Sequence, residues 1–116
     1  MARVVALFDD LLLGSNVLGM LRAAGHAARL AGPAAVPPVD ADVLVVDLGA
    51  TSFDGVAVVE SLTTAGELAG TLLLGVYSHV DADTRNRAQA AGFDLVVPRS
   101  RLAREGSVLI ARLINS

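Results

Sequence analysis

Four short runs of apolar residues, each about as long as one β-strand, limit what this chain can fold into. They are Val4–Phe8, Val43–Val46, Leu72–Tyr77 and Leu95–Val97. Each run is continuous rather than alternating, which is typical of parallel strands that helices cover on both faces. A weaker run, Ala27–Leu30, predicts a fifth strand at an edge of the sheet.

Helical patterns lie between these runs. The first ends at Gly25, a residue that suits the position after a helix, and its apolar face consists of Leu13, Val17, Leu21 and Ala24. Polar residues that can cap the later helices are Asp54, Asp81 and Ser100. The last helix should be apolar on one face and pack on the core.

The segment from Ala31 to Asp42, AGPAAVPPVDAD, contains Pro33, Pro37 and Pro38. Prolines break helices and favour extended neighbours, so we expect a loop in place of a second helix. The remaining alternation of strands and helices predicts a doubly wound α/β fold with right-handed crossovers. We therefore expect a flavodoxin-like, five-stranded parallel sheet in the order 2-1-3-4-5, with residues 1–116 forming one domain.

Composition excludes several classes of function. The chain has no cysteine, which excludes disulfides and thiolate metal sites and fits a cytoplasmic location. It has no lysine, which excludes a P-loop. A net charge of −3 argues against a nucleic-acid surface. Asp9 and Asp10 interrupt the apolar start of the chain, which argues against a signal peptide or a membrane span.

Polar residues stand where the predicted strands end: Asp9, Asp10, Asp47, Ser78 and Arg99. In an open parallel sheet, ligands bind outside the carboxyl ends of the strands, so we expect these side chains to converge. Neighbouring carboxylates repel each other unless a cation offsets their charge, and Mg²⁺ is preferred to Ca²⁺ as that cation. Such a site could hold a phosphoryl group, with Asp47 as the nucleophile.

On these residues the chain resembles the response-regulator receiver domain over nearly its whole length. "LFDD" resembles the acidic pair after the family's first strand, and "VLVVDLGATSFDG" resembles its phosphoacceptor strand and loop. "GVYSH" is similar to the strand that ends in Ser or Thr, and "AAGFDLVVPRS" to the segment that carries the family's lysine. The resemblance places Asp47 as the phosphoacceptor and Asp54 as the cap of the helix that follows.

The resemblance also implies partners and roles. Asp9 and Asp10 would bind Mg²⁺ weakly, together with Asp47 and the backbone carbonyl of Gly49. Asp47 would take a phosphoryl group from a sensor histidine kinase or a phosphotransfer protein, and Ser78 would hydrogen-bond it. The domain would stand alone and would be no enzyme beyond its own phosphorylation. It would reach an output protein through the helix after Asp81, the last strand and the last helix, where Phe93 and the apolar last helix permit a homodimer.

The sequence departs from the family pattern at several positions: Arg99 for the lysine, Ser100 for the following proline, Ala50-Thr51 for Met-Pro, and Val96 for the aromatic switch. A guanidinium that folds back onto Asp47 would neutralise it and occupy the space of an incoming phosphoryl group. Two interpretations therefore stay open. One is a phosphoaccepting receiver, and the other is a phosphorylation-independent pseudo-receiver that acts as a protein-interaction module.

Overall fold

One sheet of five strands, in the order β2-β1-β3-β4-β5, runs through the computed structural model, which describes residues 2–78 and 82–115. Every neighbouring pair of strands is parallel. The strands are β1 (Arg3–Leu7), β2 (Ala27–Ala31), β3 (Val43–Asp47), β4 (Leu72–Tyr77) and β5 (Leu95–Pro98). The predicted strand order is confirmed, and the weak run at Ala27 is the edge strand β2.

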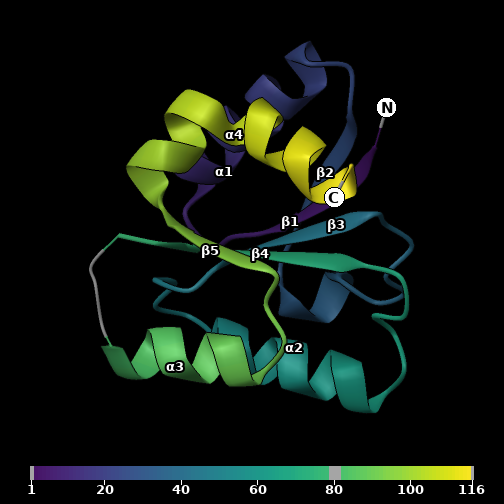
Figure 1. Cartoon of the computed structure of the whole chain (residues 1–116), viewed down its shortest axis with the longest axis vertical. Coiled ribbons are helices and arrows are strands. Elements are labelled where there is room, and N and C mark those ends of the chain that lie inside the picture. Colours follow the sequence, from purple (N-terminus) through teal and green to yellow (C-terminus); the bar gives the residue numbers. More distant parts are fainter. Residues whose placement is uncertain (1, 79–81, 116) are drawn as a thin grey trace.

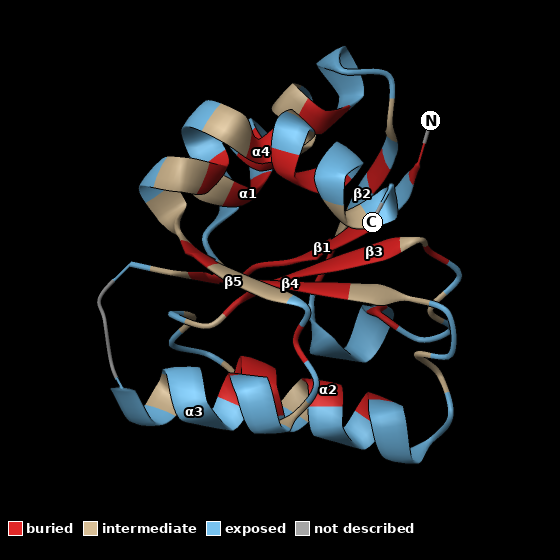
Figure 2. Ribbon diagram, viewed as in Figure 1, coloured by how far each residue is buried: buried red, intermediate tan, exposed pale blue. Residues whose placement is uncertain are grey.

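Helices cover both faces of the sheet (Figure 1). They are α1 (Leu11–Ala23), α2 (Gly55–Thr64), α3 (Ala82–Ala90) and α4 (Arg99–Ile114). One apolar core lies between the sheet and α1 with α4, and a second lies between the sheet and α2 with α3. The central strands are buried on both sides (Figure 2), which explains why their sequences are apolar without alternation.

The helix starts agree only in part with the sequence prediction. Asp54 caps α2 as expected, since its carboxylate accepts the N–H of Ala57 at 3.1 Å. Ser100 does not cap α4: that helix begins at Arg99, with Pro98 at the N-cap position and no side-chain cap. The prediction was wrong because β5 leads into α4 without a loop, which places Ser100 inside the first turn. Asp81, the predicted cap of α3, lies outside the described residues.

Two sequence predictions, that Ala24 belongs to the apolar face of the first helix and that Phe93 contributes to a dimer surface, are wrong. Ala24 is exposed because it is the C-cap of α1 and no longer part of the buried face. Phe93 is only 8% exposed and packs in the core against Gly75. It therefore cannot contribute the surface that the predicted homodimer assigned to it. The exposed apolar side chains of α4 are Val108 and Ile114.

The proline-rich segment contains no α-helix, as its prolines predict. Its regular structure is a single 3₁₀ turn, Pro33–Ala35. Val36 after this turn is fully buried, and Arg29 donates to the carbonyls of Ala35 and Val36 at 3.1 Å each. Within the described ranges, no helix combines the length and apolarity that crossing a membrane requires.

Candidate functional site at the carboxyl edge of the sheet

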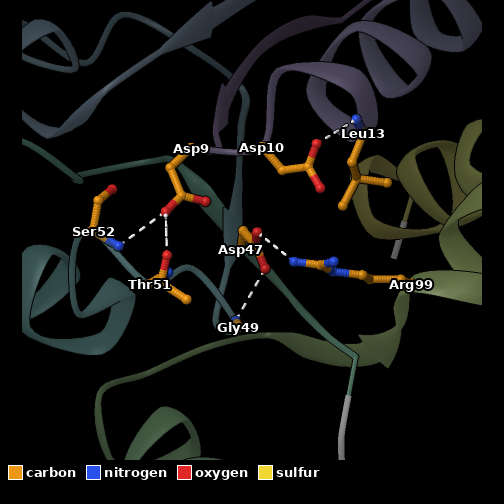
Figure 3. Close-up of polar contacts among 8 residues, drawn as sticks. All are labelled: Asp9, Asp10, Leu13, Asp47, Gly49, Thr51, Ser52 and Arg99. Carbon is orange, nitrogen blue, oxygen red and sulfur yellow. Dashed lines mark hydrogen bonds and ion pairs between the residues drawn. The ribbon is translucent and has the colours of Figure 1, made fainter.

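Asp47 ends the central strand β3. Among the described residues it is the one charged residue that is buried, with 0% of its surface exposed. Its Oδ1 accepts the N–H of Gly49 at 3.0 Å, and its Oδ2 accepts a hydrogen bond from Arg99 Nη2 at 2.8 Å (Figure 3). Both carboxylate oxygens therefore have partners inside the protein.

Arg99 reaches Asp47 from the first residue of α4, directly after β5. Since β4 lies between β3 and β5, the side chain must extend across one strand to make this contact. Its side chain is 28% exposed, whereas that of Asp47 is 0% exposed. The Asp47 end of the ion pair is thus fully buried. Removal of Arg99 would leave the Asp47 carboxylate as an uncompensated buried charge.

A third predicted side chain, Ser78, meets the pair at Gly49. A methyl group built on Gly49 would lie 3.2 Å from Ser78 Oγ, 3.5 Å from Asp47 Oδ1 and 3.6 Å from Arg99 Nη2. The hydroxyl, the carboxylate and the guanidinium therefore surround one point. Gly49 leaves that point open because it carries no side chain.

Arg99 has one buried donor atom without an acceptor among the described residues. Its Nε is buried and makes no hydrogen bond. A buried, unsatisfied polar group typically costs about 1–3 kcal/mol, more for a charged one, so such an atom calls for an explanation. An oxyanion held beside Asp47 would supply the missing acceptor.

Asp9 holds the loop that follows Asp47. Its Oδ2 accepts the N–H of Thr51 at 3.0 Å and that of Ser52 at 2.9 Å. The hydrogen bonds from Ser52, followed by that from Thr51, lower the pKa of the Asp9 carboxyl below its ordinary value. Asp9 thus fixes residues 51 and 52 beside the site.

Asp10 faces a different partner. Its Oδ1 accepts the N–H of Leu13 at 3.0 Å and caps α1. The three acids predicted to share a magnesium ion thus bind a loop, a helix end and a guanidinium. Among residues 2–78 and 82–115, no group of three acidic or histidine side chains is placed to hold a metal ion. Each of the three acids thus has at least one carboxylate oxygen bonded within the protein, and Arg99 supplies a positive charge at Asp47.

Comparison with known proteins places the fold. No protein-family model matches the chain, and no curated protein matches it significantly. Solved structures do. Chemotaxis protein CheY4 of Vibrio cholerae is 18% identical, with a TM-score of 0.85 over 97% of this chain and 98% of its own. A CheY-like receiver domain protein of Methanospirillum hungatei is 15% identical, with a TM-score of 0.87 over 99% and 94%. The chain has the fold of a response-regulator receiver domain.

A further receiver, the signal receiver domain of NarL from Mycobacterium tuberculosis, is 18% identical with a TM-score of 0.83, covering 99% of this chain and 97% of its own. The fold prediction is confirmed by these neighbours. Identities this low establish the receiver fold alone, so the chemistry of the site must be argued from its own residues.

The candidate site contains two features that sequence reasoning missed. One is that Asp10 caps α1, although an Asp directly before an apolar helical pattern is itself a capping signal. The other is the pair of backbone N–H groups from Thr51 and Ser52 on Asp9. No local sequence signal marks that second contact, because its partners are more than forty residues apart.

Proposed function

We propose that this receiver-type domain signals in a two-component pathway by accepting a phosphoryl group on Asp47 from a histidine kinase or a phosphotransfer protein. The observation that carries the proposal is the convergence of Asp47, Ser78 Oγ and Arg99 Nη2 around Gly49, at the carboxyl edge of a receiver fold. These are the groups that attack, hydrogen-bond and neutralise a phosphoryl group.

In the proposed reaction, an oxygen of Asp47 attacks the phosphorus of a phosphohistidine. The P–N bond breaks, its electron pair leaves with the imidazole, and an aspartyl phosphate forms. Arg99 must first release Oδ2, to which it is bound at 2.8 Å. Its guanidinium can then donate to the phosphoryl oxygens, and the buried Nε gains an acceptor.

Ser78 is exposed and its hydroxyl lies at the same point, so it would donate to a second phosphoryl oxygen. The reaction modifies the domain itself, so the chain acts as a signalling module rather than as an enzyme with a separate substrate. Magnesium binding by Asp9, Asp10, Asp47 and the Gly49 carbonyl stays a prediction, as does a cytoplasmic location.

The signal would pass to an output protein through α3, β5 and α4. Movement of Arg99 offers a route, because this residue begins α4 and follows β5 directly. Val108 is 54% exposed on α4 and could take part in such a contact or in a homodimer.

A second function is favoured by one observation: Asp47 has no exposed surface, and both its oxygens are engaged. In a phosphorylation-independent pseudo-receiver, the Arg99–Asp47 ion pair would be a permanent structural contact. It would fix the start of α4 for recognition by a partner protein.

Intact-mass measurement after incubation with acetyl phosphate and Mg²⁺ separates the two functions. Wild type should gain one phosphoryl group and Asp47→Asn should gain none. Arg99→Lys should gain it faster, because the guanidinium contact with Asp47 Oδ2 is gone. Asp40→Asn is the control, since Asp40 pairs with Arg3 at an exposed position away from the site. If neither wild type nor Arg99→Lys is labelled while both remain folded, the pseudo-receiver is the better description.

A further inference from the structure

At the opposite edge of the sheet, a pocket of about 430 Å³ opens where the amino ends of β1 and β2 meet the end of the proline-rich segment. Arg3 lines it from β1, Arg22 from α1 and Arg29 from β2, and Asp40 closes it from the loop. The regular structure of the segment that leads to Asp40 is a short 3₁₀ turn.

The lining is positively charged although the whole chain is acidic. Three arginines and one aspartate line the pocket, a net charge of +2, whereas the chain carries −3. A third of the chain's nine basic residues thus gather at one pocket. His26 also lines the pocket, and its Nδ1 accepts the N–H of Ala2 at 3.1 Å.

Two of the three guanidiniums have no acidic partner among the described residues. Arg3 pairs with Asp40 at 2.8 Å. Arg22 donates through Nε and Nη2 to the carbonyl of Ala28, at 3.2 and 3.0 Å. Arg29 donates only to the carbonyls of the proline-rich segment. A carbonyl accepts a hydrogen bond but does not cancel a charge, so both cations remain uncompensated.

These contacts also hold the guanidiniums in place. Each guanidinium has five N–H groups, and Arg22 and Arg29 each use two of them on carbonyls. Three donors remain on each side chain, on groups whose position is already fixed. Prepositioned guanidinium forks suit the planar or tetrahedral oxyanions of carboxylates and phosphates.

We propose that this pocket binds a phosphate monoester of a small organic molecule, with the phosphate on Arg22 and Arg29. A phosphate monoester carries about −1.5 to −2 charges at neutral pH, which matches the net charge of the lining. The pocket is larger than a bare phosphate needs and falls in the size range of small-ligand sites. Ala27, Ala28 and Ala41 supply apolar wall for the organic part. This site is separate from Asp47, and the inference stands whether or not Asp47 is phosphorylated.

The test is a ¹⁵N NMR titration with adenosine 5′-monophosphate, with adenosine as the uncharged comparison. The nucleotide should shift the amides of residues 27–29 and of Arg3, and adenosine should not. Arg29→Gln should weaken binding about tenfold or more, because it removes a charge-assisted contact. Arg104→Gln is the matched control, since Arg104 is 72% exposed on α4, and its affinity should equal that of wild type.

Arg22 also hydrogen-bonds the edge strand β2, so the affinity of Arg22→Gln is compared only after thermal unfolding shows that this variant is folded. Arg29→Lys provides a second variant that keeps the charge and loses the fork, and its affinity should fall between those of wild type and Arg29→Gln. Absence of shifts at millimolar nucleotide would overturn the proposal. So would shifts centred on Asp47 and Gly49, which would place the anion at Arg99.

Discussion

Replacing Arg99 by methionine should destabilise the protein strongly, because it leaves the Asp47 carboxylate buried without its cation. Removing one partner of a buried ion pair costs roughly 3–5 kcal/mol. Asp47 keeps the Gly49 N–H, and Arg99 is 28% exposed in wild type, so we expect a loss near the lower end, about 3 kcal/mol. That is a large part of the roughly 5–15 kcal/mol by which a domain is stable.

Urea unfolding followed by far-ultraviolet circular dichroism measures this loss. A double-mutant cycle with Asp47→Asn isolates the contribution of the pair, and the coupling free energy should be about 2 kcal/mol. Arg101→Met is the control within the same helix. It breaks the half-exposed Arg101–Glu105 contact of 3.3 Å and should change the free energy of unfolding by less than about 0.5 kcal/mol. A coupling near zero between Arg99 and Asp47 would refute the reasoning, since the pair would then contribute nothing at the site.

Three further outcomes are expected. Hydrogen bonds from Ser52, followed by that from Thr51, lower the pKa of Asp9 in the folded state, so its contribution to stability is present at neutral pH and is lost as the pH falls through the folded pKa. The protection factor of the Ser52 amide against hydrogen exchange should therefore fall in acid in wild type, whereas in Asp9→Asn it should be low at every pH. Gly55→Ala should lower the free energy of unfolding by about 1–3 kcal/mol, since its new Cβ would lie 2.7 Å from Val46 Cγ1. Gly19→Ala is the control: it has open space around it and should stabilise α1 by up to about 1 kcal/mol. Equal effects of the two substitutions in urea unfolding would contradict this. Magnesium at millimolar concentration should shift the amides around the site only weakly while the ion pair is closed, and strong saturable shifts would show that the acids do form a metal site.

The sequence determined the fold because its signals are local. A strand that is buried on both faces is apolar at every position. The run Val43 to Val46 therefore predicts such a strand without any information about the strands beside it. A capping Asp such as Asp54 acts within three residues of itself. The prolines of the segment before β3 prevent an α-helix wherever that segment lies.

The same reasoning located the site and raised the Arg99–Asp47 contact as one possibility, but it did not identify the partners of Asp9 and Asp10. Parallel strands bring their carboxyl ends to one edge of the sheet. The predicted strand order therefore implied that Asp47, Ser78 and Arg99 lie close together, as they do. A carboxylate, however, accepts from whichever donor the packing brings within about 3 Å. Asp10 was predicted to bind a metal, but its Oδ1 accepts a hydrogen bond from the first turn of α1.

Tertiary packing alone decided that Arg99 closes onto Asp47 and that Asp9 holds the loop after it. The direct passage of β5 into α4 sets where the guanidinium starts, and the width of one intervening strand sets how far it must reach. Tertiary packing likewise brings Arg22 of α1 and Arg29 of β2 to one open pocket at the amino ends of the strands. Which charges are paired and which remain free depends on distances between segments far apart in the chain, and a linear sequence does not contain those distances.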